Sequence, residues 1–426
     1  MQPSPAGSRF TLVFLLLAAF LAGSALGTQL LDRVDVANKA WTYQRTVPTL
    51  SPLGSDLQIF TEASKQMYYQ QNPLGPNYNS PPLTAAVFFP FVLLSYQMGY
   101  RVMLVVNVAC NLLSLVLVMV LAFRVFAADP GGSQSPVVPV AIGAGLLVAG
   151  VSQFFGYALE FALERGNYDS LALTAMLAGV WLGDRFPRMI WLQVLSLSFA
   201  AHLKVYPALL LFLPLWRHGW KALLPVVAIN TAMLFYFGIH RGQEFLVGLY
   251  QYASHPYIWV GNHSAASFSS LVLEPWMARV LPRPFVHGAC LAFLLGTTLA
   301  LWGLGLRKLF RHGREEGRAL WALALSIPLM SALTSVSNDY KLVIMLVPVF
   351  LAVTTLARRF LETGRRRYAV VLALVLFGVI LMQRSVLAPA LIVTANKFPV
   401  VLLLEAVVCW LVWTGAASPP ESETTA

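Results

Sequence analysis

Four short polar motifs interrupt an otherwise apolar chain, and each carries a side chain that could handle a proton or an anion. In order they are Ser55-Asp56-Leu57-Gln58-Ile59-Phe60, Asn79-Ser80-Pro81-Pro82-Leu83, Arg165-Gly166-Asn167-Tyr168-Asp169-Ser170 and His202-Leu203-Lys204-Val205-Tyr206-Pro207. A partly desolvated aspartate can take a proton from a hydroxyl. Lysine and arginine bind phosphate. Such a set is suited to a reaction in which a hydroxyl group attacks the substrate and a phosphate group leaves.

Asp56 is the candidate general base of this chemistry. It lies in the polar stretch from Asp32 to Pro82, directly before a helix-like run from Leu57 to Tyr69. The alternative is an N-cap of that helix, because Asp is a good capping residue. Asp35 and Asp32 lie close to the first apolar segment and are expected to be interfacial.

Arg165 and Lys204 are the candidate phosphate ligands. A lysine inside an apolar run is costly and marks a functional site or a paired charge, and its neighbours His202 and Tyr206 favour a phosphate-binding role. The alternatives are snorkelling of Lys204 to the interface and pairing of Arg165 with a nearby glutamate. In the same way Asp169 is either a substrate ligand or a helix cap.

Two later polar stretches could contribute to substrate binding. The aromatic segment 240–284 is either a sugar-stacking face or an aromatic belt at the membrane interface, and the turn 338–341 is either a binding element or a capped turn with an Asp–Lys pair. The candidates for substrate binding are Asn79, Asn167, Asp169, Asn262, His263 and Asp339.

The elements that must position these groups are membrane-spanning helices. The 426 residues are 58% hydrophobic and 11% charged, whereas soluble domains carry about 25% charged residues. A span needs roughly 20 apolar residues, which predicts an all-α integral membrane protein of twelve spans with both ends inside. The predicted spans are 10–28, 102–123, 137–160, 169–183, 189–203, 205–216, 222–239, 285–306, 319–335, 342–357, 368–383 and 398–414.

The distribution of basic residues supports this topology and places the four motifs outside. Cytoplasmic loops are enriched in Lys and Arg, and the loops placed inside hold more than half of the 29 Lys and Arg. Basic residues flank 189–216 at both ends, so this segment is expected to go out and return with a turn at 202–207; one tilted span is the alternative. The broken stretch 83–98 is expected to be a short re-entrant or interfacial element.

The remaining features narrow the class of protein. The net charge of +11 fits short cytoplasmic loops and not nucleic-acid binding, and the three cysteines lie in apolar runs. No nucleotide, dinucleotide or metal motif is present, so neither a cofactor nor a metal is expected. We expect a catalytic membrane module at 1–239, with a first outer loop at 32–101 that contains short interfacial helices, and an outer loop plus further spans at 240–426. The first apolar segment is expected to be an uncleaved span, with a signal peptide as the alternative.

Taken in order, the four motifs resemble the lipid-linked-sugar glycosyltransferases of the GT-C class. The greatest similarity is to glycosyltransferase family 87, bacterial mannosyltransferases that use a polyprenyl-phosphate sugar, and there is some similarity to the eukaryotic enzyme that adds the first mannose to the glycosylphosphatidylinositol anchor. The resemblance covers roughly residues 10–220, and the rest of the chain is similar mainly in hydropathy. Two details depart from the family: Arg165-Gly166-Asn167 replaces a frequent Gly-Gln-x-Asn, and a frequent His is absent from Asn338-Asp339-Tyr340.

The resemblance implies a GT-C fold and an inverting transfer of a sugar, in the first place mannose, from a polyprenyl phosphate to a lipid or glycan acceptor. The reaction would take place on the extracytoplasmic face of a bacterial inner membrane. Asp56 would be the general base, and Lys204 and Arg165 would bind the donor phosphate. A transporter or flippase of lipid-linked sugars is the alternative, but it leaves the long first loop and its aspartate unexplained. A non-catalytic assembly protein would not need Asp56 or Lys204.

Overall fold

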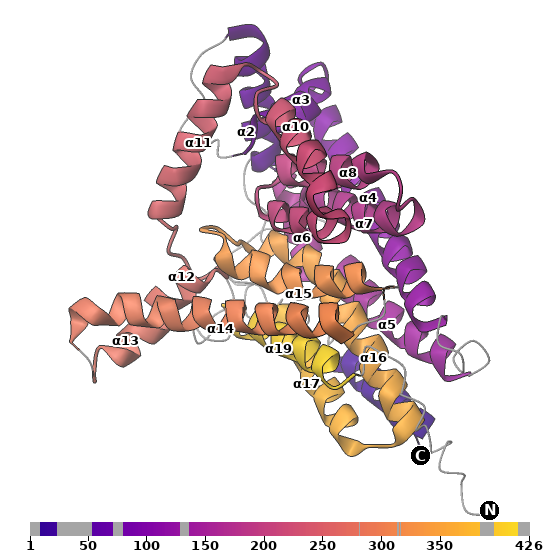
Figure 1. Cartoon of the computed structure of the whole chain (residues 1–426). Helices are drawn as coiled ribbons and strands as arrows, with labels where there is room; N and C mark the ends of the chain where they lie inside the picture. The colour runs from indigo at the N-terminus through magenta and orange to yellow at the C-terminus, as the bar shows by residue number, and fades with distance from the viewer. Residues whose placement is uncertain are drawn as a thin grey trace, which may run out of the picture.

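A computed structural model describes residues 9–23, 53–70, 80–127, 136–280, 282–312, 315, 317–383 and 396–415. These residues fold into helices joined by short turns, and within them the one backbone pairing of β type is a bridge between Asn262 and Asn338 (Figure 1). The elements are the helix Arg9–Gly23, α2 (Ser55–Lys65), η1 (Gln66–Gln70), α3 (Pro82–Val92), α4 (Tyr96–Ala127), α5 (Val137–Phe154), α6 (Tyr157–Arg165), α7 (Asp169–Arg185), α8 (Ile190–Leu203), η2 (Tyr206–Leu211), α9 (Phe212–His218), η3 (Gly219–Ala222), α10 (Leu223–Leu234), α11 (Ile239–Ser254), α12 (Ala265–Phe268), η4 (Ser269–Leu273), α13 (Glu274–Met277), α14 (Arg283–His312), α15 (Arg318–Leu333), η5 (Asp339–Met345), α16 (Leu346–Thr363), α17 (Arg366–Met382) and α19 (Phe398–Trp413).

The all-α, membrane-like class expected from composition is confirmed. By length and composition, four described helical segments could cross a membrane: Tyr96–Phe126, Val137–Arg165, Phe285–Arg311 and Asp339–Thr363. A fifth is possible if Tyr206–Leu234 and Ile239–Ser254, which meet at 97°, form one broken span. Further apolar helices are shorter than about 20 residues, so the number of twelve spans stays a prediction.

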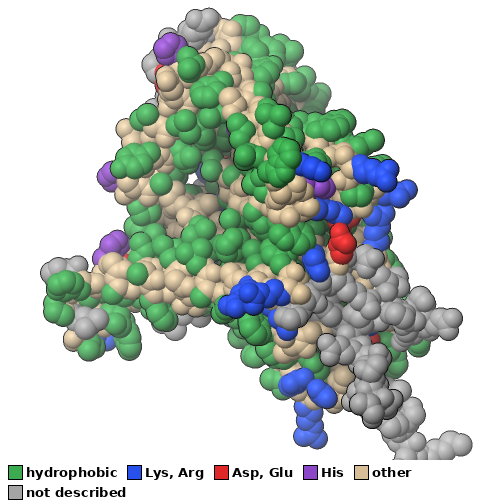
Figure 2. Space-filling model, viewed as in Figure 1, with side chains coloured by type: hydrophobic (Ala, Val, Ile, Leu, Met, Phe, Trp, Pro, Cys, Tyr) green, Lys and Arg blue, Asp and Glu red, His purple; other side chains and the backbone are tan. Residues whose placement is uncertain are grey.

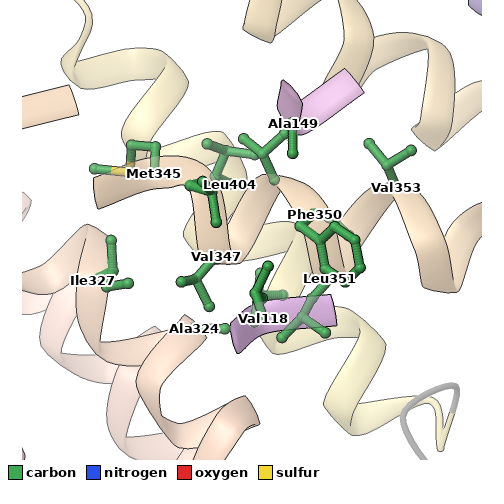
Figure 3. Close-up of a cluster of buried hydrophobic side chains, with 14 of the residues drawn as sticks. Val118, Ala149, Ala324, Ile327, Met345, Val347, Phe350, Leu351, Val353 and Leu404 are labelled. Carbon is green, nitrogen blue, oxygen red and sulfur yellow. The ribbon is translucent and has the colours of Figure 1, made fainter. Parts of the chain in front are cut away.

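The centre of the fold is α16, whose residues from Leu346 to Leu361 are buried. It packs against α5, α15, α17 and α19, and Figure 3 shows the apolar side chains that meet there, among them Phe350, Leu351 and Leu404. The approach of α5 is close, since a Cβ on Gly145 would lie 2.0 Å from Oγ1 of Thr354. A helix this apolar on all sides has to be enclosed by other helices or by lipid.

The outer surface is apolar in the way a lipid-facing surface is. The long helices α4 and α14 expose large hydrophobic side chains such as Val105 and Phe293, and Figure 2 shows hydrophobic groups over most of the visible face. On that face the Lys and Arg side chains gather at the right and lower sides. This segregation agrees with the expected basic loops at one end of the bundle.

The chain reverses direction three times between α7 and α10. Arg217 at the end of α9 bonds Asp184 at the end of α7, with 2.9 Å between Nη1 and Oδ1, so the segment after Lys204 returns alongside α8. Asn230 of α10 then donates to Ser198 of α8 at 2.9 Å. The chain therefore turns back near 202–207, which places Lys204 at the same end as the start of α7. That this segment crosses a membrane twice stays a prediction.

Three segments differ in detail from the sequence-based expectations. The predicted span 137–160 is interrupted after Phe154. The backbone N–H of Tyr157 donates to the side-chain oxygen of Gln383 at 3.1 Å, so it does not donate to a carbonyl of the preceding helical turn. The short element expected at 83–98 is α3, which ends at Val92, while the residues from Tyr96 onward begin α4. The aromatic segment 240–284 contains the 16-residue helix α11, whose residues Phe245, Leu249 and Tyr252 share one face.

Candidate functional site

Asp56 is fixed at the start of α2 by two glycine turns. Gly54 precedes the helix with φ of +77°, and its N–H donates to the carbonyl of Glu164 at 2.7 Å. Gly166 follows α6 with φ of +66°, and a Cβ there would lie 3.0 Å from the Cβ of Leu57. The first turn of α2 therefore packs directly against the turn between α6 and α7.

The carboxylate of Asp56 is held by two side chains of that turn. Arg165 donates to Oδ1 through Nη2 at 2.8 Å and through Nε at 3.0 Å, and Asn167 donates to Oδ2 at 2.8 Å. A carboxylate accepts about four hydrogen bonds, so with respect to the described residues Oδ2 keeps one acceptor position. The capping alternative for Asp56 is wrong, because Gly54 occupies the cap position and no side chain caps α2.

A second carboxylate, Asp169, is wholly buried at the start of α7. Its Oδ1 accepts a hydrogen bond from the hydroxyl of Tyr206 at 2.7 Å, and its Oδ2 lies 3.6 Å from Nζ of Lys204. The backbone is capped instead by Oδ1 of Asn167, which accepts the N–H groups of Tyr168 and Asp169. Asp169 thus positions Lys204 and does not cap the helix with its side chain.

Lys204 lies in the break between α8 and η2, with an extended backbone. Its ammonium lies 4.1 Å from the centre of the Tyr168 ring and 5.8 Å from that of Phe60, and its side chain is 16% exposed. This contradicts snorkelling to the surface. Within the described part of the chain, Nζ makes the ion pair with Asp169 and no hydrogen bond, so its N–H donors remain available.

A cavity of about 330 Å³ opens beside Lys204 and Tyr206. Its walls come from η2, α11, α15 and η5, and Figure 1 shows α11 and α15 on either side of this region. The polar part is lined by Ser80, Lys204, Tyr206, Tyr252, Thr334, Ser335, Tyr340 and Lys341. The apolar part is lined by Pro81, Val205, Leu209, Leu249, Ala253, Met330, Leu333 and Val336.

Asp56 does not line the cavity, but it lies within electrostatic range of Lys204 and Tyr340, which do. Tyr168, whose ring packs against the ammonium of Lys204, connects the surroundings of Asp56 with the residues that line the cavity. Its hydroxyl bonds Ser80 at 3.1 Å and donates to the carbonyl of Leu203 at 3.0 Å. The structure therefore brings residues of all four motifs together at one end of the bundle.

Lys341 is a site residue that the sequence analysis did not single out. It lines the cavity, is 6% exposed, and donates to Oγ1 of Thr334 at 2.9 Å and to the carbonyl of Val336 at 2.6 Å. Like Lys204, it precedes an apolar run and lies within two residues of a tyrosine. That shared pattern is the sequence signal for Lys341.

Asp339, His263 and Asn262 lie outside the cavity, in a fully buried cluster. Asp339 bonds Nε2 of His263, and both its oxygens lie 3.4 Å from Nζ of Lys397. The backbone N–H of Lys397 donates to Nδ1 of His263, so Nε2 carries the ring proton. Burial lowers the pKa of His263, which keeps the ring neutral. The alternative Asp339–Lys341 pair is thereby wrong.

Asn262 connects the two chain segments that this cluster joins. Its side-chain oxygen accepts the N–H groups of Ser264 and Ser337, and its amide donates to the carbonyls of Tyr257 and Ser335. These bonds hold the segment before α12 against the segment before η5. The cluster therefore supports the wall of the cavity from behind.

The other candidate residues have different surroundings. The side chain of His202 is largely buried and does not line the cavity. The backbone carbonyl of His202 accepts a hydrogen bond from the hydroxyl of Thr84 at 3.0 Å. Asn79 lies outside the described residues. No group of three or more His, Cys, Asp or Glu side chains suited to a metal occurs in the part of the chain that the structure describes.

Comparison with known proteins assigns the family. The model of glycosyltransferase family 87 matches residues 78–332, a stretch that contains Arg165, Asn167, Asp169 and Lys204. It stops short of Asp56 at one end and of Lys341 at the other. No curated protein and no solved structure matches the chain. A match over more than half of the sequence shows the family: the chain belongs to glycosyltransferase family 87, a family of glycosyltransferases.

Proposed function

We propose that this glycosyltransferase moves a sugar, in the first place mannose, from a polyprenyl phosphate to a lipid or glycan acceptor at the outer face of a membrane. The observation that carries the proposal is the position of Lys204, which lines the cavity and lies within electrostatic range of Asp56, the carboxylate held by Arg165 and Asn167. A proton acceptor and a cation for a leaving group are thus neighbours. Family membership favours this reaction over the transporter or flippase alternative.

The proposed reaction is one displacement at the anomeric carbon. The acceptor oxygen forms a bond to C1 of the sugar while the bond from C1 to the phosphate oxygen breaks, which inverts the configuration. Asp56 takes the proton of the acceptor hydroxyl through the free acceptor position on Oδ2. The electron pair leaves with the polyprenyl phosphate, whose developing charge is stabilised by Lys204.

The donor class follows from the two kinds of lining in the cavity. Lys204, Tyr206 and Tyr340 can bind a phosphate and sugar hydroxyls at one part, while Leu209, Leu249 and Met330 offer an apolar surface at another. A polyprenyl phosphate sugar has this same division into an anionic head and an apolar chain. Burial of the apolar part would add about 25 cal/mol per Å².

Arg165, Asp169 and Tyr206 act in this proposal mainly by positioning. Asp169 holds Lys204 at the cavity wall through the 3.6 Å ion pair, and Tyr206 fixes Asp169 by donating to its Oδ1 at 2.7 Å. Arg165 and Asn167 orient the carboxylate of Asp56, and the guanidinium adds positive charge near the donor phosphate. Each is a charge or donor that the reacting groups need in one fixed place.

The experiment that tests the proposal is transfer of labelled mannose from polyprenyl-phosphate-mannose by the purified full chain in lipid nanodiscs. The acceptor is a lipid extract of the source membranes. We expect Asp56→Asn to lower kcat/KM by about 10²- to 10⁴-fold, the range typical of a lost general base. The matched control is Asp184→Asn, because Asp184 also pairs with an arginine but lies at the other end of α7.

The outcomes separate the parts of the proposal. Equal activity of wild type and Asp56→Asn would keep the glycosyltransferase and remove Asp56 as its base. Absence of transfer with any polyprenyl-phosphate sugar would contradict the donor class. An equal loss in Asp184→Asn would attribute the effect to a general change of the fold and not to the chemistry.

A further inference from the structure

We propose that Lys341 is a second ligand of the donor phosphate and makes the cavity select a phosphate-bearing amphiphile. This inference rests on the proposed function and assigns a binding role to a residue outside the stretch matched by the family model. Lys341 and Lys204 line the same cavity and lie within electrostatic range of each other. Nζ of Lys341 lies 4.9 Å from the centre of the Tyr206 ring, and Nζ of Lys204 lies 3.6 Å from Oδ2 of Asp169, the hydrogen-bond partner of Tyr206.

Lys341 has no ion-pair partner of its own among the described residues, and the carboxylate in electrostatic range of it, Asp169, is already paired with Lys204. Nζ donates to two neutral acceptors, Oγ1 of Thr334 and the carbonyl of Val336, and no described carboxylate lies within 4.0 Å of it. An ammonium has three N–H donors, so one donor remains. Buried charges are normally paired or bind a ligand, and the open side of Lys341 is the cavity.

Lys397 shows how this protein treats a buried lysine that has a structural role. Both oxygens of Asp339 lie 3.4 Å from its Nζ, and it does not line the cavity. Lys204 has a carboxylate partner too, in Asp169. Lys341 differs from both, because its nearest partners carry no charge, and a phosphate placed between Lys204 and Lys341 would relieve the repulsion between the two ammonium groups.

The rest of the lining indicates which kind of phosphate fits. The wall that continues from Lys341 along α15 is formed by Leu333 and Met330, and Leu249 of α11 adds to it. A free phosphate would leave this apolar surface exposed, whereas the chain of a prenyl phosphate would cover it. The geometry therefore favours a ligand with both parts, the phosphate at the two lysines and the chain along α15.

The test is the discrimination between farnesyl phosphate and farnesol by the full chain in nanodiscs. The ratio of the two dissociation constants is compared between variants, so partition of each probe into the same bilayer cancels. We expect wild type to prefer the phosphate and Lys341→Met to lower this preference by about 10- to 100-fold, as expected for a lost charge-assisted hydrogen bond. Binding of farnesol should stay unchanged, which also shows that the variant is folded.

Two further variants make the result specific. Lys341→Arg keeps the charge and should retain most of the preference. Lys65→Met removes one positive charge from an exposed residue of α2 and should leave the preference unchanged; an equal loss there would indicate a general effect of net charge and overturn the inference. Displacement of farnesyl phosphate by an equal concentration of inorganic phosphate would identify a free-phosphate site and also overturn it.

The failure of this inference is distinct from the failure of the proposed function. If wild type prefers the phosphate and Lys341→Met prefers it equally, Lys341 is not a ligand, but the proposed donor stands. If wild type shows no preference, both the donor class and the role of Lys341 are contradicted.

Discussion

At the scale of single residues, the site consists of two ion pairs and one buried lysine, Lys341, that makes no ion pair within the part of the chain that the structure describes. Asp56 with Arg165, and Asp169 with Lys204, are each held by further hydrogen bonds from neutral side chains. Pairs of this kind keep side chains in place before substrate binds, which lowers the reorganisation needed during the reaction. Lys341 adds a second lysine to the cavity wall, with Thr334 and Val336 as hydrogen-bond partners.

A double substitution separates the catalytic and the structural role of Lys204. We expect Lys204→Met to lower kcat/KM by about 100-fold or more, since a removed transition-state donor typically costs that much. It should also lower the melting temperature, because Asp169 is left buried and charged without its partner.

The second substitution, Asp169→Asn, removes that unpaired charge. Lys204→Met with Asp169→Asn should therefore regain thermal stability in a melting experiment but not activity in the transfer assay. Recovery of both would show that Lys204 acts only as a structural partner of Asp169.

At the scale of elements, the site depends on the contact between the first turn of α2 and the turn between α6 and α7. Gly54 bonds Glu164 through its backbone, and Gly166 lies against Leu57 with a positive φ. The hairpin of α8 with η2 and α9 then brings Lys204 to the same end. Small changes in these turns should disturb catalysis without touching a charged group.

Gly166→Ala tests this contact. A side chain at φ of +66° costs about 1–2 kcal/mol, and the added Cβ would also press on Leu57 at 3.0 Å. We expect lower thermal stability and a lower kcat/KM, because the start of α2 moves relative to Arg165.

Gly415→Ala is the matched control for the glycine substitution. Gly415 has φ of +65°, and a Cβ there meets nothing within 4 Å. It should show the backbone cost alone in the melting curve, with transfer activity unchanged. Equal activity of the two variants would argue against a tight α2 contact as a requirement for catalysis.

At the scale of the whole molecule, the two halves of the chain form one packed body around α16. The cavity itself takes Lys204 and Tyr206 from the first half and Tyr340 and Lys341 from the second. Helices of this kind gain stability from close packing, since lipid offers no hydrophobic driving force between them.

Substitutions on one helix test how tightly this body is packed. Gly145→Ala would place a Cβ 2.0 Å from Thr354 and 3.0 Å from the carbonyl of Phe350, and overpacking typically costs about 1–3 kcal/mol. Gly143→Ala, on the same helix with nothing within 4 Å, should be neutral or stabilising by up to about 1 kcal/mol through helix propensity. Melting temperatures in one detergent compare the two; equal values would contradict a close α5–α16 contact.

The sequence by itself determined the class of the protein and the residue types of the site. Apolar runs of about 20 residues have the length of a membrane-spanning helix and not of a membrane strand, so hydropathy alone predicts an all-α fold. The motifs around Asp56, Arg165 and Lys204 were visible as polar residues where polar residues are costly. Because the basic flanks of 189–216 lie at one end, the reversal at Lys204 was also predictable.

Only the tertiary structure decided which of these residues meet. Asp56 and its partner Arg165 are 109 positions apart, and such a contact depends on how helices pack and not on local patterns. The same holds for Asp339, which lies in a closed cluster with His263 and Lys397, while its neighbour Lys341 lines the cavity. Local sequence can show that a charged residue lies where its burial costs free energy, but the tertiary structure determines which residue pairs with that charge.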